Sequence, residues 1–190
     1  MELIFATGNS NKIAEAQAII KNHKILSLND INCFEDIPET HETIYENALE
    51  KAEYIWKKYG KSCFSDDTGL EVEALGGKPG VYSARYAGQD KNPEKNMNKL
   101  LEELEGKTNR KAQFHTEVVL ILEGKVYSFQ GFVHGVITNE KRGSHGFGYD
   151  PIFLPEGFNK TLAELSSEEK NKISHRGMAL EKMGRFLWEY

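Results

Sequence analysis

The chain has 190 residues, a length that suits one domain or one core with two lobes. Hydrophobic residues make up 39% of it and its formal charge is −5, a balance that excludes an intrinsically disordered chain and leaves no broad basic surface for a nucleic-acid polymer. Its longest apolar run, Val118–Leu122, has five residues, whereas a membrane-spanning helix needs about 20, so we expect no membrane partner.

The predicted elements alternate between strands and helices before a hairpin follows. The first half of the chain predicts a strand over Leu3–Ala6, a helix to about Ile20, a helix from Glu42 to about Tyr59, and a strand over Ser62–Ser65 that ends in a turn at Asp66–Gly69. A loop at Gly76–Gly80 and a helix around Met97–Leu104 come next, followed by a hairpin of Ala112–Leu122 and Lys125–Val136 that turns at Glu123–Gly124. The chain then has a loop at Gly143–Pro151 and helices near Ser167–Lys172 and Ala179–Trp188. This order predicts an α/β fold with a mixed sheet.

The number and spacing of the cysteines indicate whether the protein works in a reducing or an oxidising compartment of the cell. Cys33 and Cys63 are the only cysteines, and they form no C-x-x-C pair. Such usage is typical of a reducing environment and speaks against a disulfide framework or a thiolate zinc site. The N-terminal residues Met1–Ile4 lack the basic and apolar regions of a secretory signal. We therefore expect a cytoplasmic protein.

The first candidate binding segment is Thr7-Gly8-Asn9-Ser10-Asn11-Lys12, where the predicted first strand gives way to a helix. A helix N-terminus presents unpaired backbone N–H groups and a positive potential, and Lys12 adds a charge, so phosphate is the natural ligand. The alternative is that Asn9 or Ser10 caps the helix while Lys12 points into solvent.

Two adjacent carboxylates, Asp66 and Asp67, form the second candidate, with Thr68 beside them. Because successive side chains of a strand point to opposite faces, we expect one aspartate to face a site and the other to brace the turn. Such carboxylates can hold Mg²⁺, which takes one or two of them, or can simply belong to a turn. Glu39 or Glu42 could supply a further ligand, or could complement the dipole of the next helix.

Three further groups suit a nucleotide. Lys51 lies on a predicted helix and either reaches a phosphate or is solvated. In the glycine-rich loop, Phe147 or Tyr149 either stacks on a flat ring or is buried by its own loop. Lys170 and the segment Ser174-His175-Arg176 supply donors and an imidazole for a base edge, or else surface and cap positions. Jointly these signals predict a nucleotide site.

Six segments in one order make the whole chain resemble the Ham1/inosine triphosphatase family, the pyrophosphohydrolases that clear inosine- and xanthosine-type triphosphates. The segments are Phe5–Lys12, Glu46–Ala52, Ser65–Leu70, Gly77–Tyr86, Gly146–Phe153 and Glu169–Gly177. The resemblance implies one domain over residues 1–190, with an elongated two-lobed α/β fold around a long mixed β-sheet, flanking helices and a nucleotide cleft between the lobes. It also implies that the protein is a homodimer.

The resemblance further implies a role for each matching residue. Asp67 matches the family's general base and metal ligand, Glu39 matches a metal-associated acid, and Thr68 matches a substrate contact that is Ser in many members. The residues that match the other substrate contacts are Thr7, Gly8, Asn9, Ser10, Asn11 and Lys12 at the triphosphate, Lys51 on the helix, and Phe147, Gly148, Tyr149, Asp150, Lys170, His175 and Arg176 at the base.

The implied reaction is NTP + H₂O → NMP + PPi with Mg²⁺, in which Asp67 positions or deprotonates the attacking water while Lys12 and Lys51 offset the charge of the pyrophosphate. We expect donors from Arg176 and the neighbouring backbone to pair with the 6-keto group of hypoxanthine or xanthine, which adenine lacks. Two alternatives are a non-catalytic nucleotide sensor and a pyrophosphatase for modified pyrimidine nucleotides.

Overall fold

The computed structural model describes all 190 residues, which divide into two compact units. Unit 1 comprises Met1–Asp67, Thr116–Gly131 and His175–Tyr190, and unit 2 comprises Thr68–His115 and Phe132–Ser174. Each unit is therefore assembled from segments that lie far apart in the sequence.

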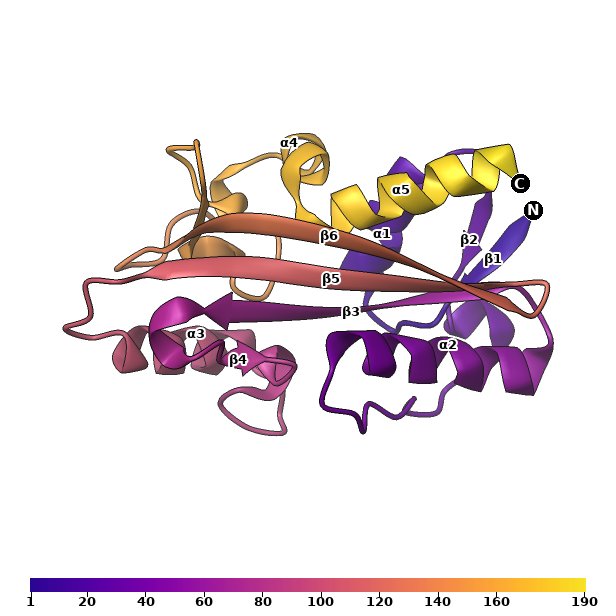
Figure 1. Ribbon diagram of the computed structural model, residues 1–190, viewed down its shortest axis with the longest axis horizontal. Coiled ribbons are helices and arrows are strands. Elements are labelled where there is room, and N and C mark those ends of the chain that lie inside the picture. The colour runs from indigo at the N-terminus through magenta and orange to yellow at the C-terminus, as the bar shows by residue number, and fades with distance from the viewer. The chain divides into compact units, whose positions relative to one another are not determined.

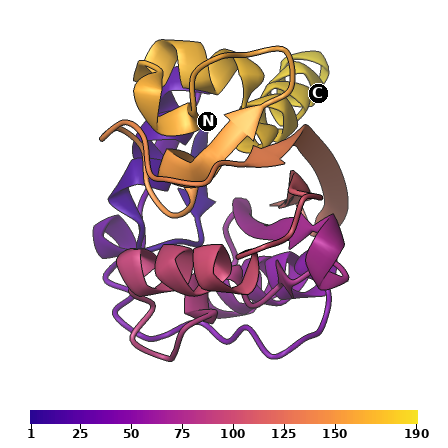
Figure 2. The same cartoon turned by 90° about the vertical axis from the view of Figure 1, so that its left-hand side faces the viewer.

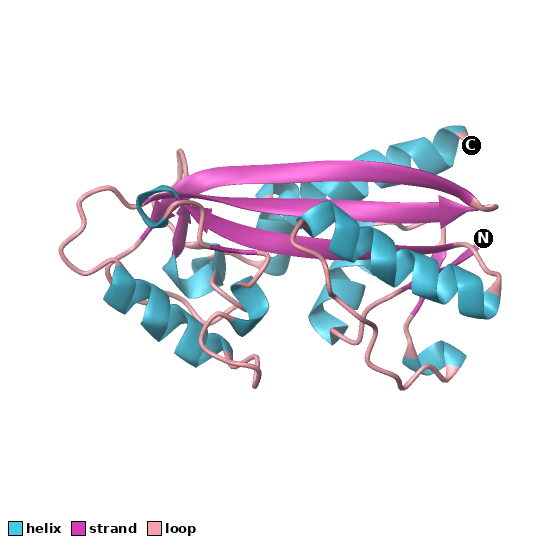
Figure 3. Ribbon diagram, turned by 60° about the horizontal axis from the view of Figure 1, so that its bottom comes forward, coloured by secondary structure: helices cyan, strands magenta, loops and turns pink.

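The elements are strands of one mixed sheet, α-helices and short 3₁₀ helices (Figure 3). The strands are β1 (Glu2–Phe5), β2 (Lys24–Leu26), β3 (Cys63–Val72), β4 (Pro79–Gly80), β5 (Lys111–Leu122), β6 (Lys125–Ile137) and β7 (Phe153–Pro155). The α-helices are α1 (Ser10–Ile19), α2 (Ile44–Tyr59), α3 (Pro93–Glu103), α4 (Ser167–Ile173) and α5 (His175–Glu189). The 3₁₀ helices are Asn29–Ile31, Glu73–Leu75, Ser83–Arg85, Asp150–Ile152 and Leu162–Glu164.

The sheet confirms the predicted mixed α/β class. Its strand order is β2-β1-β3-β5-β6-β7, and β4 pairs with β3 off this path. β1 runs parallel to β2 and β3, whereas β3 with β4 and β6 with β7 are antiparallel. None of the helices combines the length and apolar character of a membrane span.

In unit 1, helices cover both faces of the strands (Figure 1). Leu3, Phe5 and Phe64 pack with α1 and α5 on one face. Ile4 and Cys63, the alternate residues, pack with α2 on the other. The alternation follows from the two-residue period of a strand, and it decides which helix each side chain of β3 meets.

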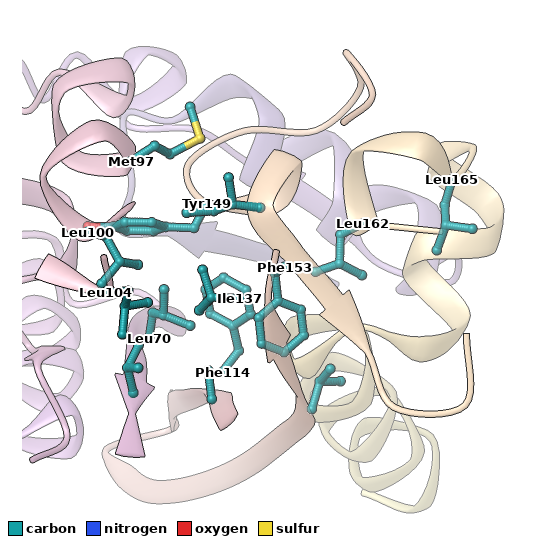
Figure 4. Packing of buried hydrophobic residues seen from close by; sticks show 14 residues of the cluster. Leu70, Met97, Leu100, Leu104, Phe114, Ile137, Tyr149, Phe153, Leu162 and Leu165 are labelled. Carbon is teal, nitrogen blue, oxygen red and sulfur yellow. The ribbon is translucent and has the colours of Figure 1, made fainter. Parts of the chain in front are cut away.

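Unit 2 has an apolar core of its own, to which α3 contributes one wall (Figure 2). Leu100 of α3 and Leu104, the residue that follows α3, share this core with Phe114 of β5 and Phe153 of β7 (Figure 4). The two phenylalanine rings lie 4.7 Å apart. Tyr149 belongs to the same cluster and is only 5% exposed. This core is the base on which the glycine-rich loop rests.

The hairpin prediction is confirmed, whereas three other predictions are wrong. Glu123 and Gly124 both have positive φ angles, 50° and 81°, as a two-residue turn between twisted strands requires. The loop predicted at Gly76–Gly80 ends in a strand, because Pro79 and Gly80 form β4 and pair with β3. The turn predicted at Asp66–Gly69 is instead the middle of β3, which lies between β1 and β5 in the sheet order; its place in the sheet outweighs the turn preference of Asp and Gly. Helix α5 begins at His175 rather than near Ala179.

Candidate active site

Asp66 and Asp67 lie in the middle of β3 and point to opposite faces of it. Phe64, two residues before Asp66, packs with α1 and α5. Ser65, two residues before Asp67, donates its hydroxyl to the carbonyl of Ala48 in α2. By the period of the strand, Asp66 therefore meets α1 and α5 while Asp67 meets α2.

Both carboxylate oxygens of Asp66 are bound. Oδ1 lies 2.9 Å from Nζ of Lys12 in α1, and Oδ2 lies 2.8 Å from Nε of Arg176 in α5. The guanidinium extends this network, since its Nη1 lies 2.8 Å from Oε2 of Glu15, three residues after Lys12. We call these four residues the Asp66 cluster; it ties α1, β3 and α5 together.

The Asp66 cluster also sets the charge of its members. Burial opposes ionisation of Asp66, but Lys12 and Arg176 outweigh burial and hold the pKa of this carboxyl well below its usual range. Burial likewise opposes the charge of Arg176, yet Asp66 and Glu15 raise its pKa. Asp66 is thus ionised at neutral pH, and both of its carboxylate oxygens have cationic partners.

Asp67 has a different environment. Nζ of Lys51 in α2 lies 3.8 Å from Oδ1 of Asp67 and 2.5 Å from Oε1 of Glu39. Oδ2 of Asp67 is buried and accepts no hydrogen bond from the protein. A buried carboxylate oxygen without a hydrogen-bond partner lowers the stability of the fold, so this atom is a candidate to bind a ligand. The solvated alternative for Lys51 is wrong, because Lys51 is 7% exposed.

The pKa of Asp67 shifts opposite to that of Asp66. Burial raises the pKa of Asp67; Lys51 opposes this rise, and Glu39 adds to it. Burial would lower the pKa of Lys51, but Asp67 and Glu39 together raise it. Neighbouring carboxylates whose pKa values are driven apart are typical of sites in which one is structural and the other reactive; that Asp67 is the reactive one stays a prediction.

Asp67 and Glu39 fit Mg²⁺ by the chemistry of their donors. Both supply hard carboxylate oxygens, and Oδ2 of Asp67 lacks a protein partner. Nowhere in the chain do three or more His, Cys, Asp or Glu side chains form a metal cage, and Mg²⁺ needs none because it takes one or two carboxylates. Of the two glutamates weighed from the sequence, Glu39 shares Lys51 with Asp67, whereas Glu42 is exposed.

Helix α2 also holds the segment that carries Glu39. Oδ1 of Asn47 accepts the N–H of His41 at 2.9 Å, and Nδ2 of Asn47 donates to the carbonyl of His41 at 3.2 Å. Glu50, one turn further, accepts the backbone N–H and the hydroxyl of Thr40 at 2.9 and 3.0 Å. One helix therefore positions Lys51 and the glutamate that Lys51 binds.

In the predicted phosphate segment, Asn9 caps α1. Its Oδ1 accepts the N–H groups of Asn11 at 3.0 Å and Lys12 at 3.3 Å, and its own N–H donates to Oγ1 of Thr7 at 3.2 Å. The capping alternative is confirmed for Asn9, but its second half is wrong because Lys12 binds Asp66 rather than solvent. A phosphate at this helix end would compete with Asn9 for two backbone donors.

In unit 2, the glycine-rich loop is built around Asp150. Its Oδ2 accepts the N–H of Phe147 at 2.9 Å and lies 2.8 Å from Nζ of Lys170. The same Nζ lies 4.5 Å from the centroid of the Phe147 ring. Gly146 has a φ of +74°, and a Cβ there would lie 2.1 Å from Oδ2 of Asp150. These residues form one compact group; their contact with a base stays a prediction.

Tyr149 and Phe147 are not equivalent. Tyr149 is buried in the core of unit 2, where its hydroxyl donates to the carbonyl of Ser83 at 2.7 Å. The alternative that the loop buries an aromatic ring is therefore confirmed for Tyr149, and the half-buried Phe147 is the better candidate for stacking. Gly148 supplies the positive φ, 65°, between these two aromatics, and Thr68 is half-buried in β3.

His175 opens α5, and its Nδ1 lies 2.5 Å from Oγ1 of Thr116 in β5. Both side chains are buried, at 4% and 0% exposed. With Arg176 bound to Asp66 and Glu15, the first turn of α5 is held by three elements of unit 1.

Comparison with known proteins identifies the family to which this chain is related. The model of the Ham1 family matches residues 3–186. The chain belongs to the Ham1 family.

The Ham1 relatives match along their full length. A protein of Flavobacterium johnsoniae named dITP/XTP pyrophosphatase is 60% identical over 184 residues, 96% of each chain. Among solved structures, the HAM1 protein of Coxiella burnetii superposes with a TM-score of 0.92 at 38% identity and covers 100% of both chains. The Ham1 protein of Staphylococcus aureus gives 0.90 at 40% identity, covering 100% of this chain and 99% of its own.

Sequence reasoning about this Ham1 chain missed three residues. Glu15 could have been found from its spacing, because it follows Lys12 by three positions on one helix face. The strand pattern predicts a turn brace for one of the two aspartates but no ion-pair network, because the partner Arg176 of Asp66 lies 110 residues away. Thr116 precedes a run of apolar residues, and no pattern in the sequence marks it.

Proposed function

We propose that this protein is a nucleoside-triphosphate pyrophosphohydrolase that converts dITP, XTP and related inosine- and xanthosine-type nucleotides to the monophosphate and pyrophosphate. The observation that carries this proposal is the likeness to a dITP/XTP pyrophosphatase at 60% identity over 96% of both chains. The division of roles between Asp66 and Asp67 supports it independently, because one carboxylate of the pair lacks partners at a buried oxygen.

In the proposed reaction, the oxygen of a water molecule bonds to the α-phosphorus and the bond from that phosphorus to the α–β bridging oxygen breaks, so that pyrophosphate leaves. Asp67 accepts the proton of the water, a task that its burial favours, since a raised pKa makes a carboxylate a better base. Lys51 keeps Asp67 ionised before the proton arrives.

Glu39 and Asp67 are the proposed Mg²⁺ ligands. When bound, Mg²⁺ would offset negative charge on the phosphates. Lys12 and Lys51 add positive charge at the same substrate groups, together with the polar segment Thr7–Asn11. Since Lys12 is bound to Asp66 in this structure, the triphosphate would have to share it with that carboxylate.

Base recognition is assigned to Phe147, which would stack on the purine, and to Lys170, His175 and Arg176, with Asp150 ordering the loop. Hypoxanthine and xanthine present a carbonyl acceptor at position 6, where adenine presents an amino donor. Donors placed for the carbonyl are left unpaired by adenine, and such mismatches discriminate by orders of magnitude.

The test is the identity of the released product. Purified protein with Mg²⁺ and dITP, ITP or XTP should release pyrophosphate and monophosphate, with ATP a much poorer substrate at equal concentration. Orthophosphate as the sole inorganic product, or ATP hydrolysed as fast as ITP, would contradict the proposal. The panel should include modified pyrimidine triphosphates, since a preference for them would replace the purine assignment. Omitting Mg²⁺ should abolish release.

The proposal extends to assembly and location. We propose a homodimer, which light scattering during size-exclusion chromatography would measure as twice the chain mass. We also propose that the protein works in the cytoplasm, and the state of Cys33 and Cys63, both buried and unbridged, supports a reducing compartment. Fractionation of the native cells tests this.

A further inference from the structure

One of the six family segments, Gly77–Tyr86, has no part in the proposed reaction. It contains Ser83, a polar residue of unit 2 that is only 7% exposed. The hydroxyl of Ser83 donates to the carbonyl of Gly80 at 2.6 Å and accepts the N–H of Leu70 at 2.8 Å. Since Gly80 of β4 and Leu70 of β3 are paired residues, Ser83 binds the start of its own 3₁₀ helix to the sheet.

The backbone of the same serine holds the glycine-rich loop. The hydroxyl of Tyr149 donates to the carbonyl of Ser83 at 2.7 Å, and both residues are buried. The direction of this hydrogen bond is fixed, because a carbonyl oxygen only accepts, and burial raises the pKa of the Tyr149 hydroxyl, which therefore keeps its proton. Ser83 thus joins the sheet to a loop that lies 66 residues further along the chain.

Tyr149 is the anchor on one side of Phe147, and a second anchor lies on the other side. There the N–H groups of Ser144 and His145 donate to one carbonyl of the 3₁₀ helix Leu162–Glu164 at 3.1 and 3.0 Å. The glycines that flank Phe147 have positive φ angles of 74° and 65° and give the backbone between the anchors wide conformational freedom. The anchors therefore help to set where the Phe147 ring lies.

We propose that Ser83 and Tyr149 are positioning residues for base recognition: the hydrogen bond from the Tyr149 hydroxyl to the Ser83 carbonyl holds the loop so that the Phe147 ring lies where it stacks on the purine. This inference rests on the proposed function, in which Phe147 stacks on the base. The family resemblance implies a substrate contact for Tyr149, whereas this proposal lets its hydroxyl act through Phe147.

The first test is the kinetics of Tyr149→Phe, which keeps the buried ring and removes the hydroxyl. The KM for ITP should rise at least about fivefold, the size of one buried hydrogen bond, while kcat stays within about twofold of wild type because the groups at the water and the phosphates are unchanged. An unchanged KM in folded Tyr149→Phe, or a fall in kcat without a rise in KM, overturns the inference.

Tyr86→Phe is the matched control. It deletes the same atom in the same unit, but the hydroxyl of Tyr86 donates to the carboxylate of Glu103 in α3 and not to the carbonyl that holds the loop. Both kinetic constants should stay within about twofold of wild type, since the loop keeps its anchor. A rise in KM as large as that of Tyr149→Phe would show a general loss of order in unit 2 and would contradict the proposal.

The two products of the proposed reaction separate the base from the phosphates. Inosine monophosphate carries the base, whereas pyrophosphate lacks it. In Tyr149→Phe, calorimetric titration should give a dissociation constant for inosine monophosphate that rises at least about fivefold, and a constant for pyrophosphate that does not change. An equal rise for both ligands refutes a role confined to base recognition.

A third readout needs no nucleotide. The N–H of Phe147 donates to Oδ2 of Asp150 at 2.9 Å, and its hydrogen exchange in the full-length protein should be at least about fivefold faster in Tyr149→Phe than in wild type. Ser83→Ala, which removes the hydroxyl that binds this 3₁₀ helix to the sheet, should speed the same exchange. Unchanged exchange in both variants contradicts the proposal, and Ser83→Ala replaces Tyr149→Phe in every measurement if the latter fails to fold.

Failure of the proposed function has a different signature. A wild-type protein that releases no pyrophosphate from ITP would refute that function, and the hydrogen exchange of Phe147 would still decide whether Tyr149 holds the loop. A wild-type protein that prefers ITP, joined to a Tyr149→Phe variant with an unchanged KM, refutes only the role of Ser83 and Tyr149.

Discussion

On the two faces of β3 within unit 1, two aspartate side chains have different ion-pair and hydrogen-bond partners. On the side of α1 and α5, Asp66 is bound by Lys12 through one oxygen and by Arg176 through the other. On the side of α2, Asp67 has Lys51 at 3.8 Å and a buried oxygen that accepts no hydrogen bond. Adjacent positions in the sequence thus belong to different electrostatic environments.

This difference separates stability from reactivity. A carboxylate saturated by cations has a lowered pKa, contributes to the free energy of unfolding, and makes a poor base. A buried carboxylate with an unsatisfied oxygen has a raised pKa and costs stability, but can take a proton or a ligand. The predictions below test whether the two sides divide in this way.

The largest effect is expected from Asp66→Asn. This change keeps the shape of the side chain but removes the carboxylate that Lys12 binds and leaves Arg176 its pair with Glu15. Breaking a buried ion pair by removing one partner costs about 3–5 kcal/mol. Urea unfolding at pH 7 measures this loss. A loss below about 1 kcal/mol would show that the Asp66 cluster does not hold α1 and α5.

Asp67→Asn should instead affect turnover. We expect kcat for ITP to fall at least about 100-fold, the low end of general-base effects. Because burial raises the pKa of Asp67, its charge costs stability at pH 7, and the free energy of unfolding should stay equal or rise. Pyrophosphate release and urea unfolding of the same sample check both parts. If Asp67→Asn lost as much free energy of unfolding as Asp66→Asn, the proposed difference between the two aspartates would be wrong.

The stability gap between wild type and Asp66→Asn should depend on pH. The folded protein holds the pKa of Asp66 below its ordinary value of 3.8, so the unfolded chain takes up a proton first as pH falls. The contribution of Asp66 is therefore complete well above pH 3.8 and is lost as pH falls through 3.8 toward the folded pKa. Unfolding series at pH 7, 5, 4 and 3 should show the gap narrowing only in the acid samples; a constant gap contradicts the assignment.

The smallest effect is expected at the edge of the cluster. Glu15→Gln removes the second carboxylate of Arg176 but leaves the first, and we expect a loss of about 1.5–3 kcal/mol, typical of one charged hydrogen bond. Glu53→Gln is the control, because its pair with Lys57 has 39% and 72% exposed side chains and should cost about 0.5 kcal/mol or less. Equal losses in the two variants would mean that the burial of Arg176 adds nothing.

Some of the fold and site could be read from residue order because local physics decides them. The hairpin turn follows from Gly124, which tolerates positive φ, and the cap of α1 from Asn9. The two-residue period of a strand also predicted that Asp66 and Asp67 would not share a direction.

Other expectations failed where a distant partner outweighs a local preference. Asp66–Gly69 has the composition of a turn, yet it is extended as the middle of β3, which lies beside β5 in the sheet. Lys51 has Glu50 and Glu53 nearby in the sequence, but it binds Glu39 and Asp67 inside the protein. Side-chain spacing along one helix does not reveal which carboxylates the fold brings to it.

By itself, the sequence determined the mixed α/β class, the capped helix after β1, the hairpin and the family motifs, since each depends on neighbouring residues or on short periodic patterns. Only the tertiary structure decided which aspartate is saturated, where Lys12 and Arg176 bind, and that Thr116 meets His175, 59 residues away. The physical reason is that burial and charge act through space: the pKa of a carboxylate is set by the groups within a few ångströms of it, whatever their distance along the chain.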